Sequence, residues 1–161
     1  MNIENLFIKG IDQSIIADCI DQMFLNPPNQ PDWALPSSYE VLLSKAADRK
    51  IAISPKINDC VCLVESKEVV DFGIAKVLAD RFSGTVIIAQ LAETIGAAGY
   101  LVYSNSKVSE FYFDENAEDP REDILNLLKR HSIPFHLMMF SEVFKLKDEG
   151  WLVKQRLLKK Q

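Results

Sequence analysis

The chain has little of what several specialised protein classes need. It contains three cysteines, an odd number, in 161 residues, so a framework of disulfide bonds is not expected. No apolar run approaches the roughly 18 residues of a membrane-spanning helix. The first residues, Met1 to Asn5, lack the basic and apolar segments of a secretion signal. We therefore expect a cytoplasmic protein that does not contact a membrane.

The residue patterns of common catalytic and cofactor sites are also missing. There is no glycine-rich phosphate-binding loop, no Gly-x-Ser-x-Gly elbow around a nucleophile and no His-Glu-x-x-His zinc motif. The only histidines, His131 and His136, have no third metal ligand unless the fold brings Asp123 or Glu142 to them. We interpret them as a helix-end residue and a strand residue. The sequence thus predicts a protein that is not an enzyme and holds no cofactor or metal.

The three cysteines fall on apolar faces of predicted elements. Cys19 lies on the apolar stripe of a helix. Cys60 and Cys62 are two residues apart in a strand, so their side chains point to the same face. Because a second Cys or His pair with metal-ligand spacing is missing, we interpret all three as buried thiols.

Composition and charge are those of one acidic globular domain over residues 1–161. Hydrophobic residues make up 48% and charged residues 25% of the chain, whose net charge is -5. Residues 141–161 hold six basic residues against three acidic ones, so the remaining 140 residues carry a net charge of -8. This acidic body disfavours nucleic-acid binding and would attract a basic protein. Such a charge also serves solubility alone.

The N-terminal third predicts a strand, a helix and a loop. Residues 3–9 are strand-like. Asp12 can cap a helix whose apolar residues, Ile15 and Ile16 among them, recur at three- and four-residue spacing up to Phe24. A proline-rich loop over residues 26–36 ends that helix. A short helix over residues 38–48 follows.

The central region carries the clearest pattern. Strands at 50–54 and 60–64 form a hairpin, and a helix over 68–82 follows, which Gly84 would end in the left-handed conformation. Three further strands are separated by turns too short for a crossover, so they should be antiparallel. These strands cover residues 85–91, 99–103 and 107–113.

The strongest local signal marks the start of a helix. Asp119 stands at the cap, Pro120 at the first helical position, and Glu122 where it can reach back to the cap amide. The helix places Ile124, Leu127 and Leu128 on one face and ends near His131. Residues 135–140 could form a last strand or begin a helix, and the basic C-terminal tail, residues 150–161, should end in a partly exposed helix.

Together these elements predict an α+β fold with a single domain. We expect an antiparallel sheet of five to six strands with two or three helices packed on one face. The aromatic residues Tyr100, Tyr103 and Phe111 to Phe113 are interpreted as cross-strand packing, because basic residues are not interleaved with them as in an RNA-binding sheet.

One acidic segment is the candidate interaction site. Six of the ten residues from 114 to 123 are acidic, in a pattern that does not fit a calcium loop. The helix cap and the helix dipole explain some of these carboxylates, and a solvated loop is the alternative for the rest. The candidate protein-binding residues are Asp114, Glu115, Glu118, Asp119, Glu122 and Asp123.

Residues 60–130, with Gly99-Tyr100-Leu101-Val102-Tyr103 and the Asp119-Pro120 cap, have a layout that resembles small acidic bacterial α+β proteins. Among these are immunity proteins that neutralise toxins in contact-dependent inhibition. The resemblance implies a non-catalytic protein-binding module that blocks a basic toxin. These proteins share no common motif, so it assigns no residue a role. The alternatives are a small-ligand-binding or enzymatic domain that uses carboxylates with Tyr100 or Tyr103, and a structural subunit.

Overall fold

The computed structural model describes residues 2–25, 49–66 and 72–156. One antiparallel sheet contains seven strands in the order β6-β5-β4-β1-β3-β2-β7. The strands are β1 (Asn2–Lys9), β2 (Arg49–Ile53), β3 (Cys60–Glu65), β4 (Thr85–Ala92), β5 (Ala97–Ser104), β6 (Lys107–Asp114) and β7 (Leu152–Arg156). The helices are α1 (Gln13–Leu25), α3 (Phe72–Arg81), α4 (Pro120–Arg130) and α5 (Phe140–Val143), with short 3-10 helices η1 (Glu93–Ile95) and η2 (Phe144–Glu149).

The predicted α+β class is confirmed, and the sheet is larger than expected. The hairpin of β2 with β3 and the series β4, β5, β6 form as predicted. The proline-rich loop 26–36 and the helix 38–48 lie outside the described residues. Among the described residues no helix is suited to cross a membrane; α1, the longest, has 13 residues.

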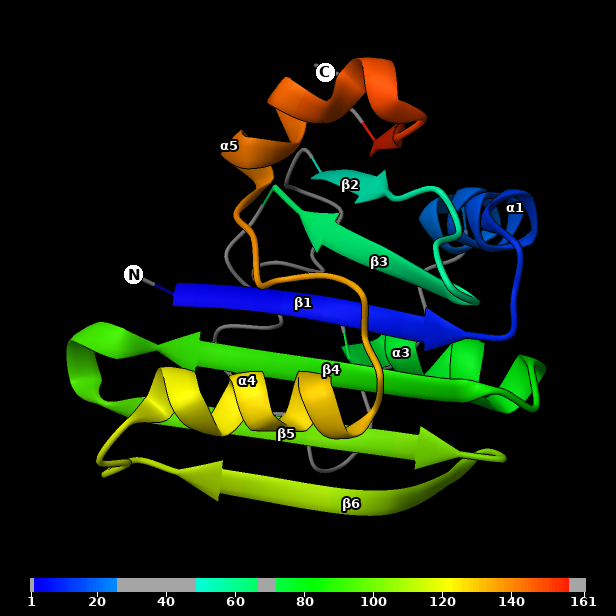
Figure 1. The fold of residues 1–161 in the computed structure, drawn as a ribbon. Helices are drawn as coiled ribbons and strands as arrows, with labels where there is room; N and C mark the ends of the chain where they lie inside the picture. The colour runs from blue at the N-terminus through cyan, green and yellow to red at the C-terminus, as the bar shows by residue number, and fades with distance from the viewer. Residues whose placement is uncertain (1, 26–48, 67–71, 157–161) are drawn as a thin grey trace, which may run out of the picture.

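Helices cover both faces of the sheet, so the prediction of a single covered face was wrong. Figure 1 shows α4 in front of β4 and β5, and α3 behind the sheet. Every residue of β3 is buried. In the centre of β1, Leu6 and Ile8 face one layer of helices while Phe7 faces the other. Strands with such unbroken apolar runs are buried on two sides.

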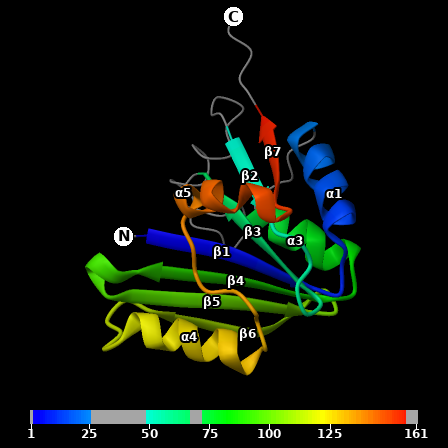
Figure 2. The ribbon, with the colours of Figure 1, turned by 45° about the horizontal axis from the view of Figure 1, so that its top comes forward.

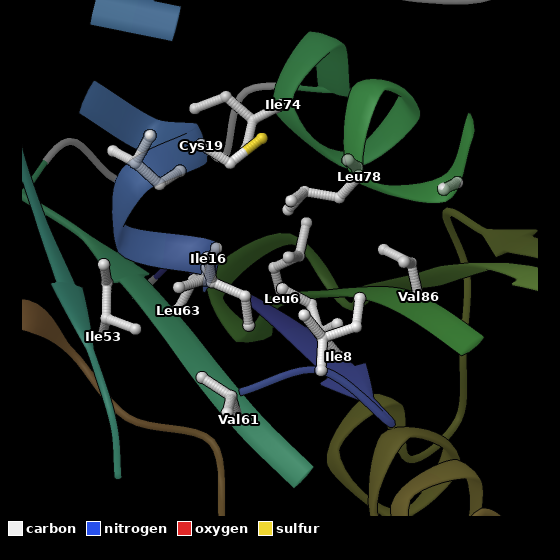
Figure 3. Close-up of a cluster of buried hydrophobic side chains, with 14 of the residues drawn as sticks. Leu6, Ile8, Ile16, Cys19, Ile53, Val61, Leu63, Ile74, Leu78 and Val86 are labelled. Atoms are coloured by element: carbon white, nitrogen blue, oxygen red, sulfur yellow. The ribbon is translucent and has the colours of Figure 1, made fainter. Parts of the chain in front are cut away.

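The first core lies between the sheet and the helices α1 and α3 (Figure 3). Ile16 of α1 and Leu78 of α3 are fully buried there against Leu6 and Ile8. Helical spacing of three and four residues brings these side chains to one stripe, as predicted. Ile15, expected on the same stripe, is 45% exposed.

The second core lies under α4 and the segment that follows it. Ile124, Leu127 and Leu128 of α4 are buried against β4 and β5, as the sequence predicted. Residues 134–139 form neither of the two expected elements but cross the sheet as irregular chain toward α5 (Figure 2). The Asn5 amide holds this chain down, because it donates to Met138 O and accepts from Met138 N, both at 2.9 Å.

Two turns show how local sequence shapes the sheet. Asn105 and Ser106 have positive φ angles of 50° and 67° between β5 and β6, a conformation that Asn tolerates. Gly84 does not have the predicted left-handed backbone. A Cβ atom there would lie 2.3 Å from the carbonyl oxygen of Lys9, so close backbone approach is the reason for glycine.

The C-terminal tail forms a strand, so the predicted helix over residues 150–161 was wrong in its described part. β7 pairs with β2 in antiparallel register, with Ala52 opposite Val153. Its backbone satisfies hydrogen-bonding groups that β2 would otherwise leave open at the sheet edge. Whether the tail forms a strand therefore depends on where β2 lies in the fold, and the sequence of the tail does not contain that information.

Candidate functional site

The acidic segment, residues 114–123, links the edge strand β6 to α4. Three of its six carboxylates hold the local fold. Asp114 Oδ1 accepts from Asn116 N at 2.8 Å, and Asp119 Oδ1 accepts from Glu122 N at 3.1 Å, which caps α4 as predicted. Asp123 Oδ2 accepts from the Tyr112 hydroxyl at 3.0 Å. These contacts explain Asp114, Asp119 and Asp123 without a partner molecule.

The other three carboxylates point into solvent. Glu115, Glu118 and Glu122 are exposed and make no hydrogen bond or ion pair with other residues in the part of the chain that the structure describes. Glu122 therefore lacks the predicted side-chain contact with the cap amide. We call Glu115, Glu118 and Glu122 the acidic surface.

A single arginine lies within the acidic segment, and an acid outside it already neutralises that charge. Arg121 forms a two-pronged ion pair with Glu93 of η1, with Nε to Oε2 at 3.1 Å and Nη2 to Oε1 at 2.5 Å. Hydrogen bonding to the guanidinium lowers the pKa of Glu93. Because Arg121 is already paired with Glu93, it does not neutralise Glu118 or Glu122, and their negative charge stays available to a partner.

The η1 turn places an exposed apolar side chain beside the acidic surface. Gly96 O accepts from Ala117 N at 2.9 Å, which ties the turn to the acidic segment. Ile95, next to Gly96, is 71% exposed. An apolar side chain beside exposed carboxylates matches the usual mixture of anchor and polar rim in protein interfaces.

Tyr100 and Tyr112 confirm the predicted cross-strand packing on the α4 face, where their rings stack with centroids 5.2 Å apart. Burial of its hydroxyl group and the hydrogen bond to Asp123 raise the pKa of Tyr112 to about 12. At neutral pH this hydroxyl is protonated and donates to a carboxylate. Phe111 and Phe113 lie on the opposite face, because successive strand residues alternate.

A charged cluster closes the other end of α4. Arg130 Nη1 donates to Glu110 Oε2 at 2.6 Å, and His131 Nε2 lies 2.9 Å from Glu110 Oε1. The guanidinium hydrogen bond lowers the pKa of Glu110. His131 is the residue after α4, as predicted, and its carbonyl accepts from Lys9 Nζ. These groups are paired with one another and attach the helix end to β6.

The remaining histidine and the cysteines lie apart from the acidic surface. His136 is not in a strand, contrary to the prediction; its side chain is 73% exposed and lies 3.8 Å from Glu142. All three cysteines are buried free thiols, as interpreted from the sequence. Burial raises the pKa of Cys60 to about 11.

Sequence reasoning missed a pair of buried carboxylates on the α1/α3 face. Glu4 and Glu65 are 8% and 7% exposed. Asn5 faces Val64 across β1 and β3, and Glu4 and Glu65 are the next residues beyond this pair, on the sheet face that Leu6 and Leu63 share. Gln90 Nε2 of β4 donates to Glu4 Oε1. The polar residues Glu4 and Asn5 among the apolar residues of β1 were the available signal, but the pairing of β1 with β3 decides which residues become their neighbours.

No family model, curated protein or solved structure matches the chain. The resemblance to immunity proteins therefore stays a prediction, and the functional argument depends on the chain's own geometry.

Proposed function

We propose that the chain is a non-catalytic protein-binding module whose acidic surface receives a basic protein. An immunity protein that neutralises a basic bacterial toxin is the specific form of this proposal. The observation that carries it is the set of three exposed carboxylates, Glu115, Glu118 and Glu122, without a partner in the described chain. They lie in a body whose residues 1–140 have a net charge of -8.

The acidic surface would contribute mainly to the rate and specificity of association. Exposed ion pairs contribute about 0.2–1 kcal/mol each, so three of them do not hold a tight complex. Long-range attraction between an acidic surface and a basic partner raises the association rate and discriminates against acidic proteins. Ile95 is the apolar side chain that a partner can cover at the centre of the contact.

The test compares proteins captured from the chain's own cells by the natural chain and by a Glu118→Gln/Glu122→Gln variant. A matched control, Asp148→Asn/Glu149→Gln, removes two exposed acids outside the segment. We expect a basic protein to bind the natural chain and the control, and to bind the first variant about two- to thirtyfold more weakly, as the loss of two exposed ion pairs implies. Its affinity should also fall as salt rises. An acidic partner, or equal binding by all three chains, would contradict the proposal.

The immunity function has a separate test in living cells. The basic partner, produced alone, should stop growth, and co-production of the natural chain should restore it. The Glu118→Gln/Glu122→Gln variant should restore growth less well than the Asp148→Asn/Glu149→Gln control at equal protein levels. If the partner is harmless when produced alone, the chain still binds a protein, but the proposal that this protein is a toxin is wrong.

A small-ligand-binding or enzymatic domain is the second candidate, and the buried pair Glu4 and Glu65 favours it. Buried carboxylates are typical of sites that transfer protons or bind cations. A thermal-shift screen of small molecules tests this candidate. A compound that raises the melting temperature of the natural chain but not of a folded Glu65→Gln variant would support it and weaken the first proposal.

A further inference from the structure

The edge strand β6 exposes an apolar stripe. It borders the sheet, and no described element lies along its outer side (Figure 1). Phe111 is 72% exposed, and Val108 and Phe113 are each 50% exposed. All three lie on the face that Leu101 and Tyr103 share with α1 and α3, but they are not part of the core that these helices cover. A long apolar edge strand is a template for pairing with another strand.

We propose that the occupant is a second copy of this chain, paired antiparallel to β6 across a two-fold axis at Phe111. The two seven-stranded sheets would then form one continuous sheet. This inference goes beyond the proposed function, because it uses the strand edge and needs no basic partner. The reasons for this occupant are the charge pattern of β6 and its apolar stripe.

Charge repulsion excludes two of the three registers whose two-fold axis passes through the middle of β6. Two-fold pairing of a strand with itself places one residue opposite its own copy. A centre at Glu110 would put Glu110 opposite Glu110, and a centre at Tyr112 would put Glu110 opposite Asp114. Both arrangements bring like charges together, which destabilises a cross-strand pair. A centre at Phe111 puts Glu110 opposite Tyr112 and avoids this conflict.

The same register also gives suitable partners to the residues at both ends of β6. β6 already has an irregularity at Ser109, because Val102 faces Glu110 while Tyr103 faces Val108. With Ser109 skipped in the same way, Val108 lies opposite Phe113 of the copy and Lys107 opposite Asp114. Lys107 is exposed and has no partner in the described chain. The two-fold axis therefore creates two opposite-charge pairs, one at each end.

On the aromatic face, this pairing produces an uninterrupted apolar row. Phe111 of each copy lies in the centre, with a Val108–Phe113 pair on either side. Directly paired residues have Cβ atoms about 4.5–5.5 Å apart, so these side chains would contact one another. Gly99 lies opposite Phe113 and leaves space for its ring. A Cβ atom at Gly99 would lie only 2.9 Å from the phenyl ring.

Sedimentation equilibrium tests the pairing. We expect the natural chain to reach twice its 18.2 kDa mass with a dissociation constant of about 1–100 µM, as for small interfaces. Phe111→Asp should weaken association at least tenfold, because it places two negative charges at the axis. Leu125→Asp, a matched change at an exposed leucine of α4, should leave it unchanged. A monomer at about 1 mM, or open-ended assemblies larger than two chains, would overturn the proposal.

A cross-linking experiment does not depend on how well Phe111→Asp folds. Phe111→Cys should form a covalent dimer under mild oxidation, because directly opposite Cα atoms lie within disulfide range. The natural cysteines are buried, and Leu125→Cys serves as the exposed control. Equal cross-linking by both variants would place the contact elsewhere.

Charge changes separate this proposal from the proposed function. Lys107→Glu turns both end pairs repulsive and should weaken the dimer at least tenfold while capture of a basic partner continues. Glu118→Gln/Glu122→Gln should leave dimerisation unchanged. A dimer that Lys107→Glu leaves intact would exclude the register centred at Phe111.

Discussion

Asn5 is a buried polar residue whose side chain bonds the backbone of the segment after α4, as a neighbouring strand would. Its amide pairs with both the N–H and the C=O of Met138, and it is fully buried. We expect Asn5→Ala to lower the free energy of unfolding by about 2–3 kcal/mol, since buried polar groups lose their partners. Urea unfolding measures this. Asn126→Ala, on the exposed side of α4, should change it by less than about 0.5 kcal/mol; an equal loss in both variants would contradict the role of the amide.

Glu110 makes stability depend on pH. Its pKa is lowered from 4.5 chiefly by the Arg130 hydrogen bond, so the charged form is more stable in the folded chain. The stabilisation is present above the unfolded pKa and is lost as pH falls through the folded one. We expect the stability difference between the natural chain and Glu110→Gln to be largest near neutral pH and to shrink below about pH 5.

Urea unfolding between pH 3 and pH 7 checks this prediction about Glu110. Glu122→Gln is the matched control, because that carboxylate has no partner in the described chain. Its difference from the natural chain should stay near zero across the range. A Glu110→Gln difference that grows as pH falls would contradict the cluster with Arg130 and His131.

Single residues were predictable where the cause was local. The Asp119 cap needs only the amide three residues later, and the structure contains it. The predicted hydrogen bond between the Glu122 side chain and the cap amide does not form, because a flexible exposed side chain gains little from one such bond. Of the six candidate site residues, the structure assigns Asp114, Asp119 and Asp123 to local contacts; sequence alone could not separate them from the exposed acids.

Among the elements, α4 shows how helical spacing sorts side chains between core and solvent. Leu127 is 1% exposed and Leu125 is 41% exposed. We expect Leu127→Ala to cost about 2–5 kcal/mol of unfolding free energy, and Leu125→Ala less than about 1 kcal/mol. Leu78→Ala in α3 should cost as much as Leu127→Ala, because both faces of the sheet have a packed layer. A small effect at Leu78 would mean that one layer is dispensable.

Elements with regular periodicity were predicted, and elements defined by a partner were not. The strands β4, β5 and β6 follow from their short turns. The helix α1 follows from its apolar spacing, and α4 follows from its spacing and its Asp119 cap. β7 was missed because its strand state comes from pairing with β2, about 100 residues earlier in the chain. Backbone pairing with an open edge outweighs a weak local helix preference.

In the whole molecule, stability should decrease from the centre of the sheet to its edges. β1 and β4 pair on both sides and lie between two layers of helices, whereas β6 and β7 each pair on one side. We expect amide hydrogen exchange to be slowest in β1 and β4 and fastest in β6 and β7. Mass spectrometry of the dilute protein measures this order. Faster exchange in β4 than in β7 would contradict the strand arrangement.

Composition and local pattern by themselves determined the α+β class, the antiparallel meander, the capped helix and the burial of the cysteines, since each depends on residues a few positions apart. The tertiary structure alone decided the two-sided helical cover, the strand β7, the Glu4–Glu65 pair and the separation of structural from exposed acids. These features arise from contacts between distant segments. The physical reason is that strand pairing and burial depend on which segments become neighbours, and a local pattern does not contain that information.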